Sequence, residues 1–200
     1  MVFIESFILG LSFSLSTVGP ITIEILRRSL KEGYISAMGI IIGATIIDFV
    51  YLTIIFSGIY HFLNFSSVNR ILTLFGMIFL LYLGYKSIHE FRKIKLKKTN
   101  KVRRNSILTG IILGISSPFA FVFYLGIFGP LVTSAGSLIS GLGIGLAIIF
   151  GIFIGDNLKA VIGHLGKEIF AEKMIKYASL IGGIALILFA FYFGYNFLVA

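Results

Sequence analysis

The 200-residue chain has no cysteine and few charged residues. Without cysteine it can form neither disulfides nor thiolate metal sites, and it cannot perform thiol redox chemistry. Asp, Glu, Lys and Arg make up 12% of the residues, about half the share found in soluble domains. Hydrophobic residues make up 58% and the mean hydropathy is +1.03, so the composition indicates a membrane protein. The first residues, MVFIES, lack a basic region and a cleavage pattern, so we expect no removable signal peptide.

Six apolar segments match the length of membrane-spanning helices, which need about 20 apolar residues. The third segment is the shortest of the six. We therefore expect an all-α polytopic protein of the plasma membrane with six transmembrane helices. The segments run from Val2 to Leu26, Tyr34 to Phe62, Ile71 to Tyr85, Ser106 to Pro130, Ala135 to Ile162 and Met174 to Val199.

The basic residues lie almost entirely on one side of these six segments. Of the 17 Lys and Arg residues, 16 fall on that side, and only Arg70 falls on the other. The positive-inside rule makes the basic side cytoplasmic and puts both termini outside. The same rule explains the net charge of +9, so we expect no nucleic-acid partner. We interpret the stretch from Arg92 to Arg104 as a topology signal rather than as a binding patch for lipid or nucleic acid.

The two halves of the chain resemble each other. Residues 6–17, SFILGLSFSLST, align with residues 106–117, SILTGIILGISS, at an offset of 100 residues. The pair 39-GIIIG-43 and 151-GIFIG-155 and the pair 82-YLGY-85 and 192-YFGY-195 follow in the same order. Three spans are an odd number, so the second half must cross the membrane in the opposite sense. This pattern predicts a 3+3 inverted repeat, typical of secondary transporters, with halves at 1–90 and 106–200 and a basic cytoplasmic linker at 91–105.

A proline interrupts the first segment of each half near its centre. A break exposed to lipid would leave backbone polar groups without partners, so each break should face protein or a water-lined cavity. There the freed backbone groups and neighbouring hydroxyls can bind a substrate. The alternative is a kink that only shapes packing, with hydroxyls bonded to their own helix. The predicted substrate-binding residues are Ser16, Thr17, Gly19, Pro20, Ser116, Ser117 and Pro118.

Asp48 lies in the middle of the second segment. An aspartate at the centre of a membrane helix costs about 2.5–3.5 kcal/mol, so such a residue is a functional candidate by default. We expect Asp48 to take up and release protons during transport. The alternative is a hydrogen-bonded aspartate that holds helices together.

The fifth segment carries a second polar group, 155-GDNLK-159. Asp156 and Lys159 are three residues apart, so they share a helix face and can pair. We expect Asp156 to take part in proton coupling, with Asn157, Lys159 and Glu24 in supporting roles. The alternative for Lys159 is that it extends to the membrane surface. For Glu24, which lies near Arg27 and Arg28, the alternatives are a part in a cytoplasmic gate and an exposed ion pair at a helix end, and we expect the ion pair.

Other chemistry is not indicated. The three histidines fall near segment ends and form no metal-ligand pattern, and no nucleophile–base pair is visible. We therefore expect no enzyme and no cofactor. The glycine pairs Gly39–Gly43 and Gly151–Gly155 have the spacing that lets membrane helices approach closely.

The stretch 18-VGPITIEILRRSLKEGYISAMGIIIGATIID-48 resembles the lysine exporter (LysE) and threonine/homoserine efflux (RhtB) family of amino-acid exporters. That family has Pro-Gly-Pro in the first span, then a basic turn, a glycine-rich second span and an aspartate. The chain departs from the pattern in two places: Val18 replaces the first proline, and Ser117-Pro118-Phe119 replaces an Asn-Pro-Lys. The resemblance covers the whole chain and implies an efflux transporter. The matching residues are Gly19, Pro20, Arg27, Gly33, Gly39, Gly43 and Asp48.

The sequence as a whole predicts a secondary transporter that exports an amino acid or similar small zwitterion. Export would be driven by the proton gradient and proceed by alternating access. The expected partners are a small-molecule substrate and membrane lipid. A homo-oligomer is a further alternative, and the sequence does not give the oligomeric state. Two alternatives remain: a divalent-cation exporter that uses Asp48 and Asp156 as ligands, and a membrane scaffold subunit without transport.

Overall fold

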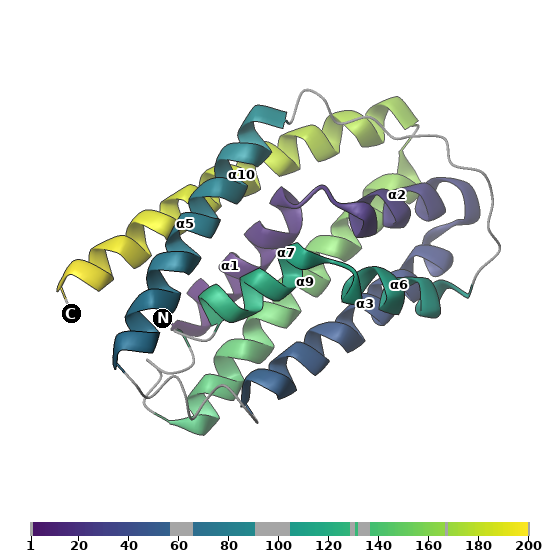
Figure 1. Cartoon of the computed structure of the whole chain (residues 1–200). Coiled ribbons are helices and arrows are strands. Elements are labelled where there is room, and N and C mark those ends of the chain that lie inside the picture. The colour runs from purple at the N-terminus through teal and green to yellow at the C-terminus, as the bar shows by residue number, and fades with distance from the viewer. Residues whose placement is uncertain are drawn as a thin grey trace.

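The computed structural model describes residues 2–56, 66–90, 105–128, 131, 137–166 and 168–199. All regular structure within these ranges is helical, which confirms the predicted all-α class for the described part of the chain. The helices lie side by side in one elongated bundle (Figure 1). They are α1 (Val2–Ser16), α2 (Pro20–Glu32), α3 (Tyr34–Ile54), α5 (Ser66–Glu90), α6 (Ser106–Ile115), α7 (Pro118–Phe123), the π-helix η3 (Tyr124–Phe128), α9 (Leu138–Leu165) and α10 (Glu168–Val199).

Several helices are long and apolar enough to cross a membrane. Three of them pass this test alone, over residues 34–54, 139–165 and 173–192. The pair α1 and α2 passes it as one span bent by 75°. Many large apolar side chains are exposed on the outer faces of the bundle, as a lipid environment requires. The chain is therefore a polytopic membrane protein, and the count of six spans stays a prediction.

The first predicted break is present. Helix α1 ends at Ser16 and α2 begins at Pro20. Proline suits the first position of a helix, because its φ is already helical and its missing N–H has no partner there. The predicted first span ended at Leu26, but α2 continues to Glu32, so the region expected to be a basic turn is helical. Gly33 ends this helix with a φ of +91°, which other residues rarely adopt.

The second predicted break is present as well. Helix α6 ends at Ile115, and α7 begins at Pro118. The Asn105 side chain caps the start of α6 by accepting a hydrogen bond from the Ile107 backbone N–H at 3.1 Å. The Ser117 hydroxyl accepts one from the Ala120 N–H at 3.4 Å, at the start of α7. Both halves thus open with a helix that is interrupted close to its expected centre.

The other helices differ from their predicted limits by a few residues. Helix α5 extends beyond the predicted 71–85 at both ends, α9 starts and ends three residues later than predicted, and α10 starts six residues earlier. Boundaries are the least determined feature of an apolar pattern, because helix can continue into polar residues. The ends predicted at Phe62 and Pro130, and the linker up to residue 104, lie outside the described residues.

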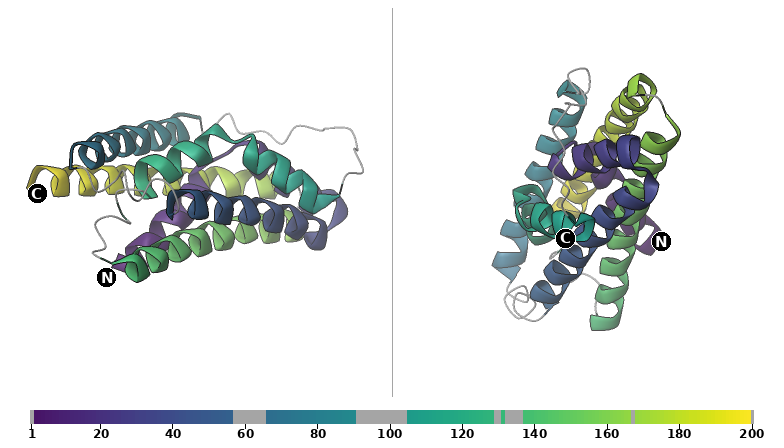
Figure 2. Two further views of the ribbon diagram at one scale, coloured as in Figure 1. Left: turned by 60° about the horizontal axis from the view of Figure 1, so that its bottom comes forward. Right: turned by 90° about the vertical axis from the view of Figure 1, so that its right-hand side faces the viewer.

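The long helices pack in pairs. Helix α1 runs along α9, α6 runs along α3, and α5 runs along α10. Helix α2 lies across α3 and α9, and η3 packs on α5. Figure 2 shows that the α2–α3 connection and the start of α6 lie at one end of the bundle. Both chain termini lie toward the other end (Figure 2).

Two of these pairs make matching close contacts through glycine. A Cβ atom at Gly10 of α1 would overlap the carbonyl oxygen of Ile148, and one at Gly110 of α6 would overlap that of Ile40. Both pairs therefore pack backbone to backbone, and each needs a residue without a side chain at this point.

The same correspondence recurs one turn further on. A Cβ at Gly151 of α9 would overlap the carbonyl oxygen of Phe7, and one at Gly43 of α3 would overlap that of Ile107. These contacts relate α1 to α6 by 100 residues and α3 to α9 by 108 residues. The predicted match of Gly39 with Gly151 is therefore one helical turn out of register.

In the corrected register, Asp48 corresponds to Asp156. The wrong register came from matching two Gly-x-x-x-Gly patterns, which Ile-rich membrane helices contain by chance. The contacts instead align 39-GIIIGATIID-48 with 147-AIIFGIFIGD-156.

Candidate functional site

A cavity of about 220 Å³ lies between the two helix breaks. A single water molecule needs about 10–15 Å³ on this measure, so the cavity has room for a small solute. Its walls are mostly apolar, with a few polar groups that converge on it. Binding sites for small molecules commonly have this composition.

Both predicted breaks line this one cavity. Thr17, Gly19 and Pro20 contribute from the first break, and Ser116 and Ser117 contribute from the second. Helices α1 and α6 thus end at the same place, although 100 residues separate them in the sequence. The structure therefore brings together the two segments whose proximity the sequence left undetermined.

Ser16 and Pro118 stand apart from this group. The Ser16 hydroxyl donates to the Ser12 carbonyl at 2.5 Å, and its own carbonyl accepts from the Ser87 hydroxyl at 3.1 Å. The Ser16 carbonyl thus contacts α5, its hydroxyl lies close to Gly182 of α10, and Ser16 is not among the cavity-lining residues. Pro118 begins α7, and its side chain lies outside the described part of the structure.

Threonine hydroxyls donate hydrogen bonds to backbone carbonyls at the end of α1. The Thr17 hydroxyl donates to the Phe13 carbonyl at 2.7 Å, and the Thr22 hydroxyl donates to the Thr17 carbonyl at 2.8 Å. Ser16 and Thr17 thus bond back to their own helix, as the packing alternative required. Within the described residues the Ser116 hydroxyl makes no such bond, and Ser116 is exposed at the cavity.

A buried ion pair closes one side of the cavity. The Lys159 ammonium lies 2.9 Å from Asp156 Oδ1, and Lys159 is only 2% exposed. The predicted pairing is therefore confirmed, and Lys159 does not extend to the membrane surface. The ammonium also donates to the Ser14 carbonyl at 2.7 Å and to the Thr22 hydroxyl at 3.0 Å.

These contacts use the full capacity of the lysine. An ammonium group has three donors, and here it has three acceptors. The Ser14 hydroxyl adds a bond to Asp156 Oδ1 at 2.7 Å. The Ser14 carbonyl belongs to the last turn of α1, where the helix dipole places partial negative charge. The cation is thus held both by a carboxylate and by a helix end.

Asp48 lines the same cavity as this pair but has different neighbours. It is 9% exposed and lines the same cavity, but no Lys or Arg in the described part of the chain pairs with it. Two tyrosines surround it. The Tyr124 side chain lies beside the Asp48 carboxyl, and the Tyr51 ring lies 5.5 Å from that of Tyr124. The Tyr51 hydroxyl donates to the Gly114 carbonyl at 3.4 Å, near the end of α6.

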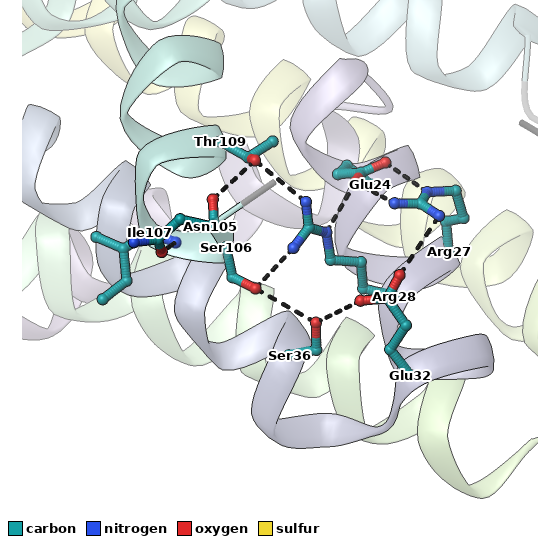
Figure 3. Close-up of polar contacts among 9 residues, drawn as sticks. All are labelled: Glu24, Arg27, Arg28, Glu32, Ser36, Asn105, Ser106, Ile107 and Thr109. Carbon is teal, nitrogen blue, oxygen red and sulfur yellow. Dashed lines mark hydrogen bonds and ion pairs between the residues drawn. The ribbon is translucent and has the colours of Figure 1, made fainter. Parts of the chain in front are cut away.

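Glu24 belongs to a separate polar cluster that joins α2 to α6 (Figure 3). Its carboxylate pairs with Arg27 at 2.5 Å and with Arg28 at 2.8 Å. The Arg28 guanidinium also donates to the Ser106 and Thr109 hydroxyls, at 2.6 and 3.1 Å. Arg27 and Arg28 are 7% and 3% exposed, so the expectation of an exposed ion pair at a helix end is wrong. Because α2 lies against α3, α9 and the start of α6, these charges are covered by protein.

Asn157 has a packing contact outside the cavity. Its amide nitrogen donates to the Phe153 carbonyl at 2.8 Å, and its oxygen accepts from the Tyr34 hydroxyl at 2.7 Å. Asn157 therefore joins the start of α3 to α9. It supports the arrangement of the helices rather than the cavity wall.

Sequence reasoning missed Ser14, Thr22, Tyr51 and Tyr124. Ser14 and Thr22 were overlooked because they lie just outside the STVGP stretch, one helical turn or less from the break. Tyr51 and Tyr124 were overlooked because their spans are rich in aromatic residues. The correct register would have drawn attention to Tyr51, because an offset of 108 residues makes it the equivalent of Lys159 in the first half.

Comparisons with known proteins identify a family and a relative. The family model described as LysE type translocator matches residues 11–197. The chain is 28% identical to a Bacillus subtilis (strain 168) protein named "Putative amino acid efflux protein YcgF". That alignment spans 201 residues, covering 98% of this chain and 96% of the relative. No solved structure matches the chain significantly.

Proposed function

Because the chain belongs to the LysE type translocator family, we propose that it exports an amino acid or a similar small zwitterion. The chain is a multi-pass protein of the cell membrane, and its family indicates a transporter rather than an enzyme. The name of its Bacillus relative supports amino acids as the substrate class. The observation that carries the proposal is the single cavity lined by both helix breaks, Asp48 and Asp156.

The proposed architecture has six spans arranged as a 3+3 inverted repeat with both termini outside. The matching contacts of α1 with α9 and of α6 with α3 support the repeat. The distribution of Lys and Arg supports the orientation, with the α2–α3 connection on the cytoplasmic side. Inverted repeats place the substrate site where their broken helices meet, which is where the cavity lies.

The start of α2 can receive a carboxylate. Pro20, Ile21 and Thr22 line the cavity, and the first amides of a helix have no acceptor within it. The helix dipole adds partial positive charge at this end. In this proposal the substrate carboxylate lies near the first turn of α2.

We assign two barriers between the cavity and the ends of the bundle. On the side assigned as outer, the Phe13 ring stacks on Phe123 with centroids 3.8 Å apart. On the side assigned as inner, Arg28 ties α2 to Ser106 and Thr109 of α6. Alternating access requires that these barriers open one at a time. The aromatic pair and the arginine cluster are the proposed outer and inner gates.

Coupling to the proton gradient is assigned to Asp48. Export driven by an inward proton gradient requires a group that binds a proton from outside and releases it inside. Asp48 is a carboxyl group at the cavity without a basic partner among the described residues, so it can lose and regain a proton. Asp156 is neutralised by Lys159 in this arrangement, which assigns it a supporting role in coupling.

Counterflow in proteoliposomes tests the proposal. Vesicles preloaded with unlabelled amino acid should take up the labelled amino acid only if the protein carries it. We expect saturable counterflow for one amino-acid class. Imposed pH gradients should accelerate transport by the natural protein and by the control Glu5→Gln, but not by Asp48→Asn.

The same panel includes manganese and other divalent ions. Among the described residues, no three His, Asp or Glu side chains come close enough to form a metal site, so we expect no signal from these ions. Counterflow of a metal without any amino acid would reject the amino-acid proposal. Silence with every solute would favour a scaffold subunit.

A further inference from the structure

The cavity contains two matching polar arrangements, one from each half of the chain. Ser14 in α1 corresponds to Gly114 in α6, because 100 residues relate these helices. Asp156 and Lys159 in α9 correspond to Asp48 and Tyr51 in α3, because 108 residues relate these. The close approach of the helices at these positions supports the match. A Cβ at Gly155 would lie 2.8 Å from Ser14 Cβ in the first arrangement. In the second, a Cβ at Gly114 would lie 3.0 Å from Ile47 Cβ.

Lys159 and Tyr51 make equivalent contacts in the two arrangements. The Lys159 ammonium donates to the Ser14 carbonyl at 2.7 Å, and the Tyr51 hydroxyl donates to the Gly114 carbonyl at 3.4 Å. Each acceptor lies in the last turn of the first helix of its half. The equivalent helix ends therefore accept a hydrogen bond from a cation in one half and from a neutral hydroxyl in the other.

The first arrangement shows which ligand this geometry accepts. A carboxylate, the negative end of a helix and a hydroxyl surround one primary ammonium group in it. All of these acceptors belong to buried residues. Such a set of acceptors selects a cation that carries N–H donors.

The second arrangement has the carboxylate and the helix end, but no cation from the described part of the chain. Asp48 is one of the residues at the cavity wall, together with Gly114, Ser116 and Ser117. No basic side chain of the described residues pairs with Asp48. The cavity of about 220 Å³ lies directly beside these groups.

We propose that Asp48 and the carbonyl end of α6 bind the ammonium group of the transported substrate, as Asp156 and the end of α1 bind Lys159. The inference rests on the proposed export function and specifies which part of the cavity recognises the amino group. The chain thus has two ammonium sites of common design. One is filled permanently by its own lysine, and the other is open to a solute.

This assignment gives a physical basis for exchange with protons. A single carboxylate holds either a proton or an ammonium group, because protonation removes the charge that attracts the cation. Release of one substrate ammonium therefore accompanies uptake of one proton at Asp48. On the outer side a high proton concentration favours release, and on the inner side the deprotonated carboxylate binds the next substrate.

Carbodiimide labelling tests the proposal on the full-length protein in lipid nanodiscs. Dicyclohexylcarbodiimide modifies membrane-embedded carboxyl groups, and mass spectrometry of peptides reports Asp48 and Asp156 separately. Methylammonium is the probe, tetramethylammonium is the control for charge without N–H donors, and sodium is the control for an inorganic cation. We expect methylammonium at ten times its dissociation constant to slow labelling of Asp48 by about tenfold, and to leave Asp156 unaffected.

Matched substitutions should exchange the behaviour of the two sites. Lys159→Met empties the first site, so Asp156 should become reactive and protectable by methylammonium. Tyr51→Lys supplies a tethered ammonium to the second site, so Asp48 should lose both its reactivity and its protection. Tyr51→Phe is the control that changes the side chain without adding charge.

Thermal unfolding provides a readout that does not depend on reagent access. Methylammonium should raise the Tm of the natural protein but not that of Asp48→Asn, with Glu5→Gln as a second variant that removes a carboxylate outside the cavity and keeps the site intact. Equal protection or stabilisation by tetramethylammonium or sodium would overturn the ammonium assignment, as would the absence of any methylammonium effect. Amino-acid counterflow in the same preparation without a methylammonium effect rejects only this site, whereas silent counterflow with a methylammonium effect rejects only the export function.

Discussion

Each of the two helix breaks brings a carboxylate close to the carbonyl end of a helix, but among the described residues a lysine lies between them only at the first break. At the first break, Lys159 fills the space between Asp156 and the end of α1. At the second, Asp48 and the end of α6 line the cavity, and no basic side chain of the described residues fills the equivalent place. Under the proposed ammonium assignment, one binding geometry can serve as a structural joint in one half of the chain and as a ligand site in the other.

The surroundings of the two breaks differ in the same sense. Polar contacts hold the helix after the first break, because Arg28 links α2 to α6 and the Ser29 hydroxyl donates to the Ala160 carbonyl of α9. Ring contacts hold the helix after the second break, because Phe123 of α7 stacks on Phe13. Apolar contacts are less directional than hydrogen-bonded charges, so we expect α7 to change position at lower cost than α2.

The largest predicted difference between the Asp156 site and the Asp48 site is in the free energy of unfolding of their variants. Lys159→Met leaves Asp156 buried without its cation, and breaking a buried pair in this way costs about 3–5 kcal/mol. Asp48→Asn removes no ion pair among the described residues, so it should change stability much less. Denaturant unfolding in detergent measures both variants. The double variant Asp156→Asn with Lys159→Met should recover part of the loss, and equal losses for the two single variants would contradict the comparison.

A second prediction tests whether the halves are structurally equivalent. Gly10→Ala and Gly110→Ala each push a methyl group against a carbonyl oxygen of the facing helix. Overpacking of this kind costs about 1–3 kcal/mol, and the two losses should be similar. Gly19→Ala is the control, because a Cβ there has no neighbour within 4 Å. A loss at only one of the two matched glycines would reject the equivalence.

A third prediction concerns the polar joint between α2 and α6. Arg28→Gln removes the charge pair with Glu24 and weakens the contacts to Ser106 and Thr109. We expect a loss of about 1–3 kcal/mol and easier opening of the cavity on the cytoplasmic side. Lys31→Gln on the same helix is the control, because Lys31 is exposed.

Site-directed cysteine labelling measures this opening. The chain has no cysteine of its own, so Ser117→Cys provides a single reactive position at the cavity. A membrane-impermeant thiol reagent applied from the cytoplasmic side should modify it faster when Arg28→Gln is present. Unchanged modification rates from this side would reject the role of Arg28 as a gate.

The smallest predicted effect separates the hydroxyls of the two breaks. The Thr17 hydroxyl is committed to the Phe13 carbonyl, so Thr17→Ala should leave the apparent affinity for substrate nearly unchanged. The Ser116 hydroxyl faces the cavity, so Ser116→Ala should weaken substrate binding by about 1 kcal/mol, or roughly fivefold. Concentration-dependent counterflow gives both values. A larger effect at Thr17 than at Ser116 would reverse the assignment.

The sequence was sufficient for the helical class, the breaks at Pro20 and Pro118 and the pairing of Asp156 with Lys159. Each of these follows from local rules: apolar length, proline geometry and a spacing of three residues on a helix. The burial of Arg27 and Arg28 could not be predicted in this way. It depends on α2 continuing to Glu32 and lying across α3 and α9, which is a tertiary arrangement.

The register between the halves also required the structure. Gly43 and Gly151 are equivalent because of the backbone atoms they touch, and small-residue spacing alone could not distinguish this match from its neighbour. The partners of Lys159 were likewise hidden, because Ser14 and Thr22 lie 145 and 137 residues away in the chain. Long-range contacts of this kind leave no periodic pattern in a single sequence.

Lys159 has a further consequence for motion. A ligand joined by a covalent tether stays at high effective concentration and does not diffuse away, so its site is occupied in nearly every conformation. The Lys159 ammonium donates hydrogen bonds to the end of α1, the start of α2 and the middle of α9. We therefore expect these three segments to move together. The two sides of the cavity are therefore held differently, and we expect α6 with α7 to be the part that changes position when the cavity fills and empties.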